Sequence, residues 1–127
     1  ADEFAHDIAK QPTEEAFFRY VRKYHFAKNV RRFTSDYACN EFASATGVNF
    51  FNGYAEAYEM GSSVRGMSGD YARNEWASLV AKHPKSSEYL KTYREAYQFA
   101  RQVRGLSGDY ACNEFASQQA GAAHGAL

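Results

Sequence analysis

A short motif that occurs three times constrains this chain of 127 residues more than any other feature. Each copy places Asp, Tyr, Ala, Asn, Glu, an aromatic residue, Ala and Ser at the same offsets. The copies begin at Asp36, Asp70 and Asp109, so they are separated by 34 and 39 residues. Periods of this size are typical of stacked supersecondary units, and the sequence therefore predicts a repeat architecture.

The repeat extends upstream of the motif. Two tyrosines, then a Val-Arg pair, precede each aspartate at matched distances: Tyr20, Tyr24, Val30 and Arg31; Tyr54, Tyr58, Val64 and Arg65; Tyr93, Tyr97, Val103 and Arg104. Because the two tyrosines are four residues apart, they lie on one face of a helix. The motif that follows has apolar residues at helical spacing as well, so each unit reads as a helical hairpin. The predicted units cover residues 14–44, 50–78 and 87–117.

The predicted fold is therefore all-α, with three repeated hairpins and about six main helices in a single domain over residues 1–127. The hairpins could close around a pseudo-threefold axis or stack as a short solenoid. Gly66 and Gly105 follow a basic residue and predict the ends of first helices. Arg32 stands at this position in the first copy, so we expect that helix to end differently. Helix N-caps are expected at Thr13, at Ser86 or Ser87, at Ser68 or Asp70, and at Ser107 or Asp109. We also expect a leading helical turn around Phe4 and Ile8. The tail over residues 118–127 is expected to fray.

Composition excludes several classes of function. Fifteen basic and fifteen acidic residues cancel, which argues against a nucleic-acid partner. No apolar run approaches the roughly 18 residues of a membrane-spanning helix. The four histidines share no ligand spacing and no phosphate-binding loop is present, so we expect neither a metal nor another cofactor. The start Ala-Asp-Glu-Phe resembles the product of signal-peptide cleavage, and we expect export to the periplasm, the cell exterior or an organelle lumen.

The recurring arginine predicts an ion pair within each hairpin. The arginine lies near the end of the first helix, and a glutamate lies on the helix that doubles back. A bidentate Arg–carboxylate bond would tie the two helices together. The predicted pairs are Arg31–Glu41, Arg65–Glu75 and Arg104–Glu114.

Cys39 and Cys112 occupy the same position in copies one and three. A disulfide between them would require the hairpins to close around a common axis, since its Cα atoms must lie within about 7 Å. The alternative is two buried thiols that pack as small apolar residues. Arg73 takes this position in the second copy.

These features favour a non-catalytic binding or accessory subunit with a protein partner. Copy two departs from the others at Arg73 and Trp76, so the candidate binding residues are Arg73, Trp76, Tyr71, Tyr54 and Tyr58. Two alternatives remain: a small hydrolase that uses carboxylates from different repeat copies, with Glu75 and Asp70 as candidate residues, and a carrier of an apolar small molecule such as a pigment or lipid. A carrier should enclose a cavity of several hundred cubic ångströms, on the order of other ligand pockets, whereas an interaction module should expose aromatic side chains.

Overall fold

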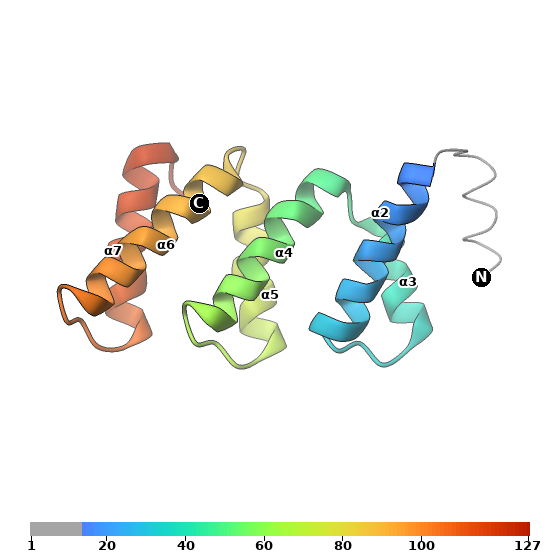
Figure 1. Cartoon of the computed structure of the whole chain (residues 1–127), viewed down its shortest axis with the longest axis horizontal. Helices are drawn as coiled ribbons and strands as arrows, with labels where there is room; N and C mark the ends of the chain where they lie inside the picture. Colours follow the sequence, from blue (N-terminus) through green and yellow to red (C-terminus); the bar gives the residue numbers. More distant parts are fainter. Residues whose placement is uncertain (1–13) are drawn as a thin grey trace. The chain divides into compact units, whose positions relative to one another are not determined.

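The computed structural model describes residues 14–127, which hold six α-helices and one five-residue π-helix and no strand (Figure 1). The all-α prediction is confirmed for this part of the chain. The expected cap at Thr13 and the expected turn around Phe4 and Ile8 lie outside the described residues. The chain divides into two compact units, residues 1–48 and 49–127, and each is described by itself. The single domain over residues 1–127 stays a prediction.

The first unit consists of α2 (Glu14–His25), the π-helix η1 (Phe26–Val30) and α3 (Asp36–Ala45). Acidic residues occupy the first turn of α2 and basic residues its last, which complements the helix dipole. The π-helix places Phe26 against α3, where its ring stacks on Phe42 at a centroid distance of 6.0 Å. Ala27, Cys39 and Ala43 are buried beside it, so small residues let the two helices approach closely.

The second unit consists of α4 (Val48–Ser63), α5 (Asp70–Ala81), α6 (Ser86–Gln102) and α7 (Asp109–His124). In Figure 1 the chain doubles back between α4 and α5 and again between α6 and α7. Tyrosines, rather than aliphatic residues, supply most of the large buried side chains: Tyr54, Tyr58, Tyr89 and Tyr93 are all fully buried. Along α6 the rings of Tyr89, Tyr93 and Tyr97 follow one another at 6.2 and 5.9 Å. The predicted tyrosine stripe is thus the core-facing side of the helix.

Each second helix begins at the motif aspartate, but the caps differ from those expected. Ser35 caps α3, because its side-chain oxygen accepts a hydrogen bond from the Ala38 amide at 3.1 Å. Gly69 and Gly108 are the N-cap residues of α5 and α7 and offer no side-chain bond. The predicted caps at residues 68 or 70 and 107 or 109 are therefore wrong. The aspartates, as first helical residues, are left to accept bonds from other helices.

The tail also differs from the expectation, because α7 continues to His124 rather than fraying after residue 117. Two hydrogen bonds hold this extension. The Thr92 hydroxyl lies 2.9 Å from His124 Nε2, and His83 Nε2 lies 2.8 Å from the Gly125 carbonyl oxygen. Since His83 Nδ1 accepts from the Lys85 amide, its Nε2 carries the proton and donates to Gly125.

The three first-helix ends share one geometry, although the first copy lacks glycine. Gly66 and Gly105 have φ of +73° and +70°, and Arg32 adopts the same left-handed conformation at +68°. In each copy the next amide donates to the carbonyl six residues back: Phe33 to Ala27, Met67 to Gly61 and Leu106 to Ala100. The expectation that the first copy ends differently is confirmed for its last turn, which is the π-helix Phe26–Val30, but wrong for the residue after it, since Arg32 adopts the conformation of the two glycines. In the first copy the bond from the Phe33 amide to the Ala27 carbonyl oxygen offsets the cost of the left-handed conformation at Arg32.

Replacing Arg32 by glycine is therefore expected to raise the free energy of unfolding by about 1 kcal/mol, because glycine adopts positive φ without a Cβ clash. Urea unfolding followed by circular dichroism measures the change. The matched controls, Gly66→Ala and Gly105→Ala, should each lower stability by about the same amount, since their added Cβ atoms meet no neighbour but the backbone strain remains. A destabilised Arg32→Gly variant would contradict the prediction.

Candidate functional site

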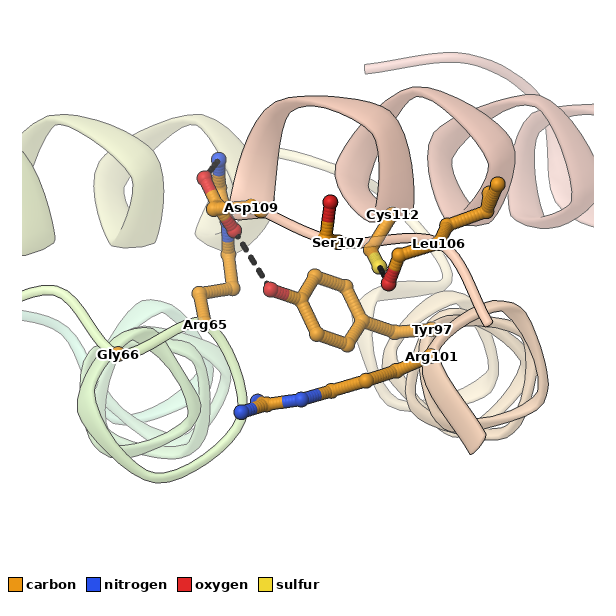
Figure 2. Close-up of a pocket in the computed structure, with 9 residues that line it drawn as sticks. Arg65, Gly66, Tyr97, Arg101, Leu106, Ser107, Asp109 and Cys112 are labelled. Carbon is orange, nitrogen blue, oxygen red and sulfur yellow. Dashed lines mark hydrogen bonds and ion pairs between the residues drawn. The ribbon is translucent and has the colours of Figure 1, made fainter. Parts of the chain in front are cut away.

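The candidate site is a pocket of ≈ 400 Å³ in the second unit, lined by residues of α6, α7 and the loops that follow α4 and α6. Figure 2 shows the side chains around it. At its centre Asp109 receives two bonds from the Arg65 guanidinium, from Nε at 3.0 Å and from Nη2 at 2.7 Å. The Tyr97 hydroxyl donates to the same carboxylate at 2.9 Å. The first turn of α7 is thus joined both to the end of α4 and to α6.

Electrostatics keep this cluster ionised. Burial works to raise the pKa of Asp109, but hydrogen bonds from Arg65 and Tyr97 outweigh it and hold the pKa below its usual value. Burial also works to lower the pKa of Arg65, and the bond to Asp109 outweighs it, so the pKa of Arg65 is raised. Burial, and then the bond to Asp109, raise the pKa of Tyr97 to about 12. Near neutral pH the cluster contains a carboxylate, a guanidinium and a neutral phenol.

Arg65 corrects the predicted ion pairs. Its partner is Asp109, at 2.7 Å, and not Glu75 of its own hairpin. Glu41 accepts a hydrogen bond from Tyr37 at 3.4 Å, and Glu114 accepts one from Tyr110. Among the described residues no ion pair joins Arg104 to Glu114. The motif glutamate is turned about 140° from the motif aspartate around the helix, so it lies away from the first helix.

The recurring arginine instead packs on an aromatic ring of its own hairpin. The Cζ atom of Arg65 lies 5.1 Å from the ring centroid of Trp76, and that of Arg104 lies 5.1 Å from that of Phe115. In the first copy the Arg31 Cζ lies 4.4 Å from the Phe33 ring. These cation–π contacts, rather than ion pairs, are what the three arginines share within their hairpins.

The polar bonds that do recur join the first-helix tyrosines to the second helix. The leading tyrosine donates to the motif asparagine at 2.5–2.6 Å in every copy: Tyr20 to Asn40, Tyr54 to Asn74 and Tyr93 to Asn113. The second tyrosine of each first helix donates to the motif aspartate. These bonds are Tyr24 to Asp36 and Tyr58 to Asp70, both at 2.6 Å, and Tyr97 to Asp109 at 2.9 Å. Sequence reasoning missed these bonds. The signal was present, because the partners recur together at constant separations of 20 and 12 residues.

The five predicted binding residues lie in different environments. Tyr54, Tyr58 and Trp76 are buried, and the Trp76 ring packs on Tyr93 at a centroid distance of 5.1 Å. Arg73 is half-buried over the Tyr58 ring at 3.9 Å and donates to the Tyr58 carbonyl oxygen at 3.0 Å. Tyr71 is 77% exposed. Of the five, Tyr71 is thus the residue most open to a partner.

Arg73 fits because the helix opposite it carries a glycine. A Cβ atom on Gly61 would lie 3.3 Å from Arg73 Cγ and 3.3 Å from Met67 Sδ. The matching residues in the other copies are alanines, Ala27 and Ala100, and these copies carry the small cysteine in place of arginine. Copy two therefore differs by a compensating pair of residues, Gly61 with Arg73.

This pairing predicts that the effect of Gly61→Ala on the free energy of unfolding depends on the residue at position 73. Gly61→Ala should be neutral or destabilising in the natural chain because Arg73 crowds the new methyl group. In an Arg73→Cys background the same change should stabilise the protein by about 1 kcal/mol, because alanine is the better helix former and the methyl group fills space. Urea unfolding of the four chains of this double-mutant cycle measures the coupling. Equal effects of Gly61→Ala in both backgrounds would contradict the prediction.

The predicted disulfide is not formed, since Cys39 and Cys112 are both free buried thiols. Each is satisfied inside its own unit. The Cys39 thiol donates to the Phe33 carbonyl oxygen at 3.9 Å, and the Cys112 thiol donates to that of Leu106 at 3.6 Å. The two cysteines share a repeat position because each packs against the loop just before its own helix. The sequence spacing alone could not distinguish this from closeness of the two cysteines to each other.

Thiol titration provides the test. Two free thiols per chain are expected under denaturing, non-reducing conditions, and both should react slowly in the native protein because their exposed fractions are only 2% and 1%. A denatured chain with no reactive thiol would contradict this assignment.

The remaining pocket groups are polar rather than reactive. Arg101 is exposed, and in Figure 2 its side chain reaches from α6 across the pocket. Ser107 and Gly108 line the pocket near the start of α7. The carboxylate is engaged by two residues and the Cys112 thiol is buried, so the pocket offers mainly hydrogen bonds and positive charge. Its walls suit a polar group better than an apolar carrier ligand.

No known protein or family indicates a role for this pocket. Comparison with protein-family models, with curated proteins and with solved structures finds no match. Within residues 14–127 no group of three or more His, Cys, Asp and Glu side chains could hold a metal ion. None of the six described α-helices combines the length and the apolar composition that spanning a bilayer requires.

Proposed function

We propose that this protein is a non-catalytic binding subunit that recognises a protein partner through the second helices of its repeats. The observation that supports this most directly is a tyrosine exposed at the same position in every copy. Tyr37, Tyr71 and Tyr110 have exposed fractions of 73%, 77% and 79%. Tyrosine is enriched at binding hot spots, and three tyrosines exposed at matched positions offer a partner the same contact in each copy.

The setting of these tyrosines supports recognition. Each follows the first residue of its helix, so its position is set by the helix start. Tyr37 donates to Glu41 at 3.4 Å, and Tyr110 is bonded to Glu114, which raises the pKa of Tyr110. A ring held by a neighbouring carboxylate loses less side-chain entropy when a partner binds. The pair also presents an apolar ring beside a negative charge, which favours a partner with basic and apolar groups.

The same proposal includes a threefold hairpin repeat as the scaffold. It rests on the recurring Tyr–Asn and Tyr–Asp bonds, on the recurring cation–π contacts and on the shared helix ends. It also keeps the expectation of an exported protein, which fractionation of the source cells would test. The hydrolase and carrier alternatives gain no specific support, because Asp70 accepts the Tyr58 hydroxyl and the ≈ 400 Å³ pocket is polar.

Affinity capture from the native source at low salt, with mass spectrometry of proteins and small molecules, tests the proposal. The natural chain should retain a protein partner, and the variant Tyr71→Ser/Tyr110→Ser should lose it. The matched control is Leu79→Ser, which alters another exposed apolar side chain of the second unit, 53% exposed. A stoichiometric small molecule, or a partner retained equally by all three chains, would overturn the proposal.

A further inference from the structure

The contact inside the second unit defines a repeatable interface. It joins the pair α4–α5 to the pair α6–α7. Arg65 crosses it to Asp109 and its side chain is only 9% exposed. Trp76 crosses it to Tyr93, and Glu56 approaches Arg94 at 4.0 Å. Met60, on the same side of α4, is 3% exposed.

The matching positions of α6 and α7 carry the same kind of residues but are not covered. We call Phe99, Val103, Arg104 and Phe115 the α6–α7 face. Phe99 is 47% exposed, whereas Met60 at the same repeat position is 3% exposed, and Val103 is 69% exposed. Phe115 stands where Trp76 stands and stacks on Phe99 at 6.3 Å.

Arg104 on this face is held ready for a carboxylate. The Arg104 Cζ atom lies 5.1 Å from the centroid of the Phe115 ring. The Arg65 Cζ atom lies at the same distance from the Trp76 ring. No acidic side chain among residues 14–127 forms an ion pair with it. Beside it is a hollow of ≈ 240 Å³ lined by Arg104, Leu106, Tyr110 and Phe115, among others. The α6–α7 face therefore carries the same kinds of groups that α4–α5 uses to contact α6–α7, but it has no such contact within the second unit.

The first unit carries the other half of such a contact. Tyr24 donates to Asp36 at 2.6 Å, as Tyr97 donates to Asp109, and Tyr20 donates to Asn40, as Tyr93 donates to Asn113. Asp36 is exposed, whereas Asp109 is half-buried under Arg65. The rim pair Glu56–Arg94 has no counterpart, because Val21 stands at the position of Arg94. The central charge and aromatic groups are nevertheless all present.

We propose that the α6–α7 face binds the α2–α3 pair of a second copy of this chain, with Arg104 paired to Asp36 of that copy. Phe99 and Val103, now 47% and 69% exposed, then become buried. Both halves belong to one chain, so the contact is heterologous and association can continue beyond two copies unless a ring closes. The inference goes beyond the proposed function, because the α6–α7 face does not include the exposed tyrosines on which that proposal rests.

Sedimentation velocity of the full chain over a wide concentration range tests the inference. The natural chain should self-associate, and Arg104→Glu and Asp36→Arg should each weaken association by about tenfold or more, because like charges then meet. An equal mixture of the two variants should associate again, since the glutamate introduced in one then meets the arginine introduced in the other. Asp36→Asn, which keeps an acceptor for Tyr24, is a milder variant and should also weaken association.

Lys91→Glu is the charge-matched control, because this exposed residue of α6 lies outside the α6–α7 face. It should associate like the natural chain, and circular dichroism should show that all variants are folded. A natural chain that stays monomeric throughout, or a mixture that does not recover association, would overturn the inference. Such results leave the tyrosine-dependent capture above unaffected, and loss of that capture with self-association intact would reject only the proposed function.

Discussion

Replacing Asp109 by alanine is expected to lower the free energy of unfolding by about 3 kcal/mol, the largest effect of any single substitution considered for this protein. The change removes the ion-pair partner of Arg65, whose side chain is 9% exposed, and leaves that charge without a carboxylate. It also removes the acceptor of the buried Tyr97 hydroxyl. The value lies at the lower end for a broken buried ion pair because the Asp109 side chain is itself 36% exposed.

Asp36→Ala is the matched control, because it removes the aspartate from the same repeat position. Asp36 is exposed and accepts from Tyr24, so its loss should cost about 1 kcal/mol or less. Urea unfolding followed by circular dichroism compares the two variants. Equal losses would show that the position in the repeat matters and that the bond to Arg65 does not.

The same cluster predicts a direction for acid unfolding. The pKa of Asp109 is lower in the folded chain than in the unfolded chain, so the unfolded chain binds the proton more readily as the pH falls. The stabilisation is therefore complete above the ordinary carboxyl pKa of about 4 and is lost as the pH falls through the lower folded value. In Asp109→Asn this part of the acid dependence should disappear. A natural chain and an Asn variant with parallel stability curves below about pH 4 would contradict the assignment.

Replacing Asn113 by alanine should lower the free energy of unfolding by about 2 kcal/mol, because it leaves the Tyr93 hydroxyl without an acceptor. Tyr93 is 0% exposed and its hydroxyl lies 2.5 Å from Asn113 Oδ1. Burial raises the pKa of Tyr93 well above its usual value, so the phenol remains a donor throughout the neutral range. Water cannot readily replace the lost acceptor at this depth.

The repeat supplies the controls for this second prediction. Asn40→Ala should cost less than Asn113→Ala, because Tyr20 is only half-buried whereas Tyr93 is fully buried. Adding Tyr93→Phe to Asn113→Ala should recover part of the loss, since the unsatisfied hydroxyl is then absent. Thermal and urea unfolding of the natural chain, the two single variants and the double variant measure the coupling. No recovery in the double variant would mean that the loss comes from α7 and not from the tyrosine.

The sequence predicted the elements well where local chemistry decides them. Tyrosines at helical spacing mark the buried side of α4 and α6, and Gly66 and Gly105 mark helix ends at positive φ. Arg32 shows the limit of this reasoning. Its side chain argues against the left-handed conformation, but the backbone bond from Phe33 to Ala27 stabilises that conformation regardless. Local preference was overruled by a hydrogen-bonding geometry that the three copies share.

The candidate site was not predicted from the sequence, which named only Arg65 at its centre, as half of an ion pair within a hairpin. The recurrence of arginine and glutamate led to a predicted Arg65–Glu75 pair, but the carboxylate that Arg65 binds is Asp109. Successive residues of a helix point in different directions, so only the packing of α7 beside the end of α4 selects which acid the arginine meets. The asparagine and aspartate acceptors of the tyrosines were missed for the same reason, although each tyrosine precedes its acceptor by a constant 20 or 12 residues.

What the sequence alone determined is therefore periodic and local: the all-α structure of residues 14–127, the glycines that end two of the first helices, and which helix faces are apolar. Repetition reveals such features because the same short-range forces act in every copy. Tertiary structure alone decided the pairing of Arg65 with Asp109, the separate burial of Cys39 and Cys112, and the exposure of Phe99 where Met60 is covered. These depend on which helix lies beside which, and identical motifs acquire different surroundings when one has a neighbour and the other has none.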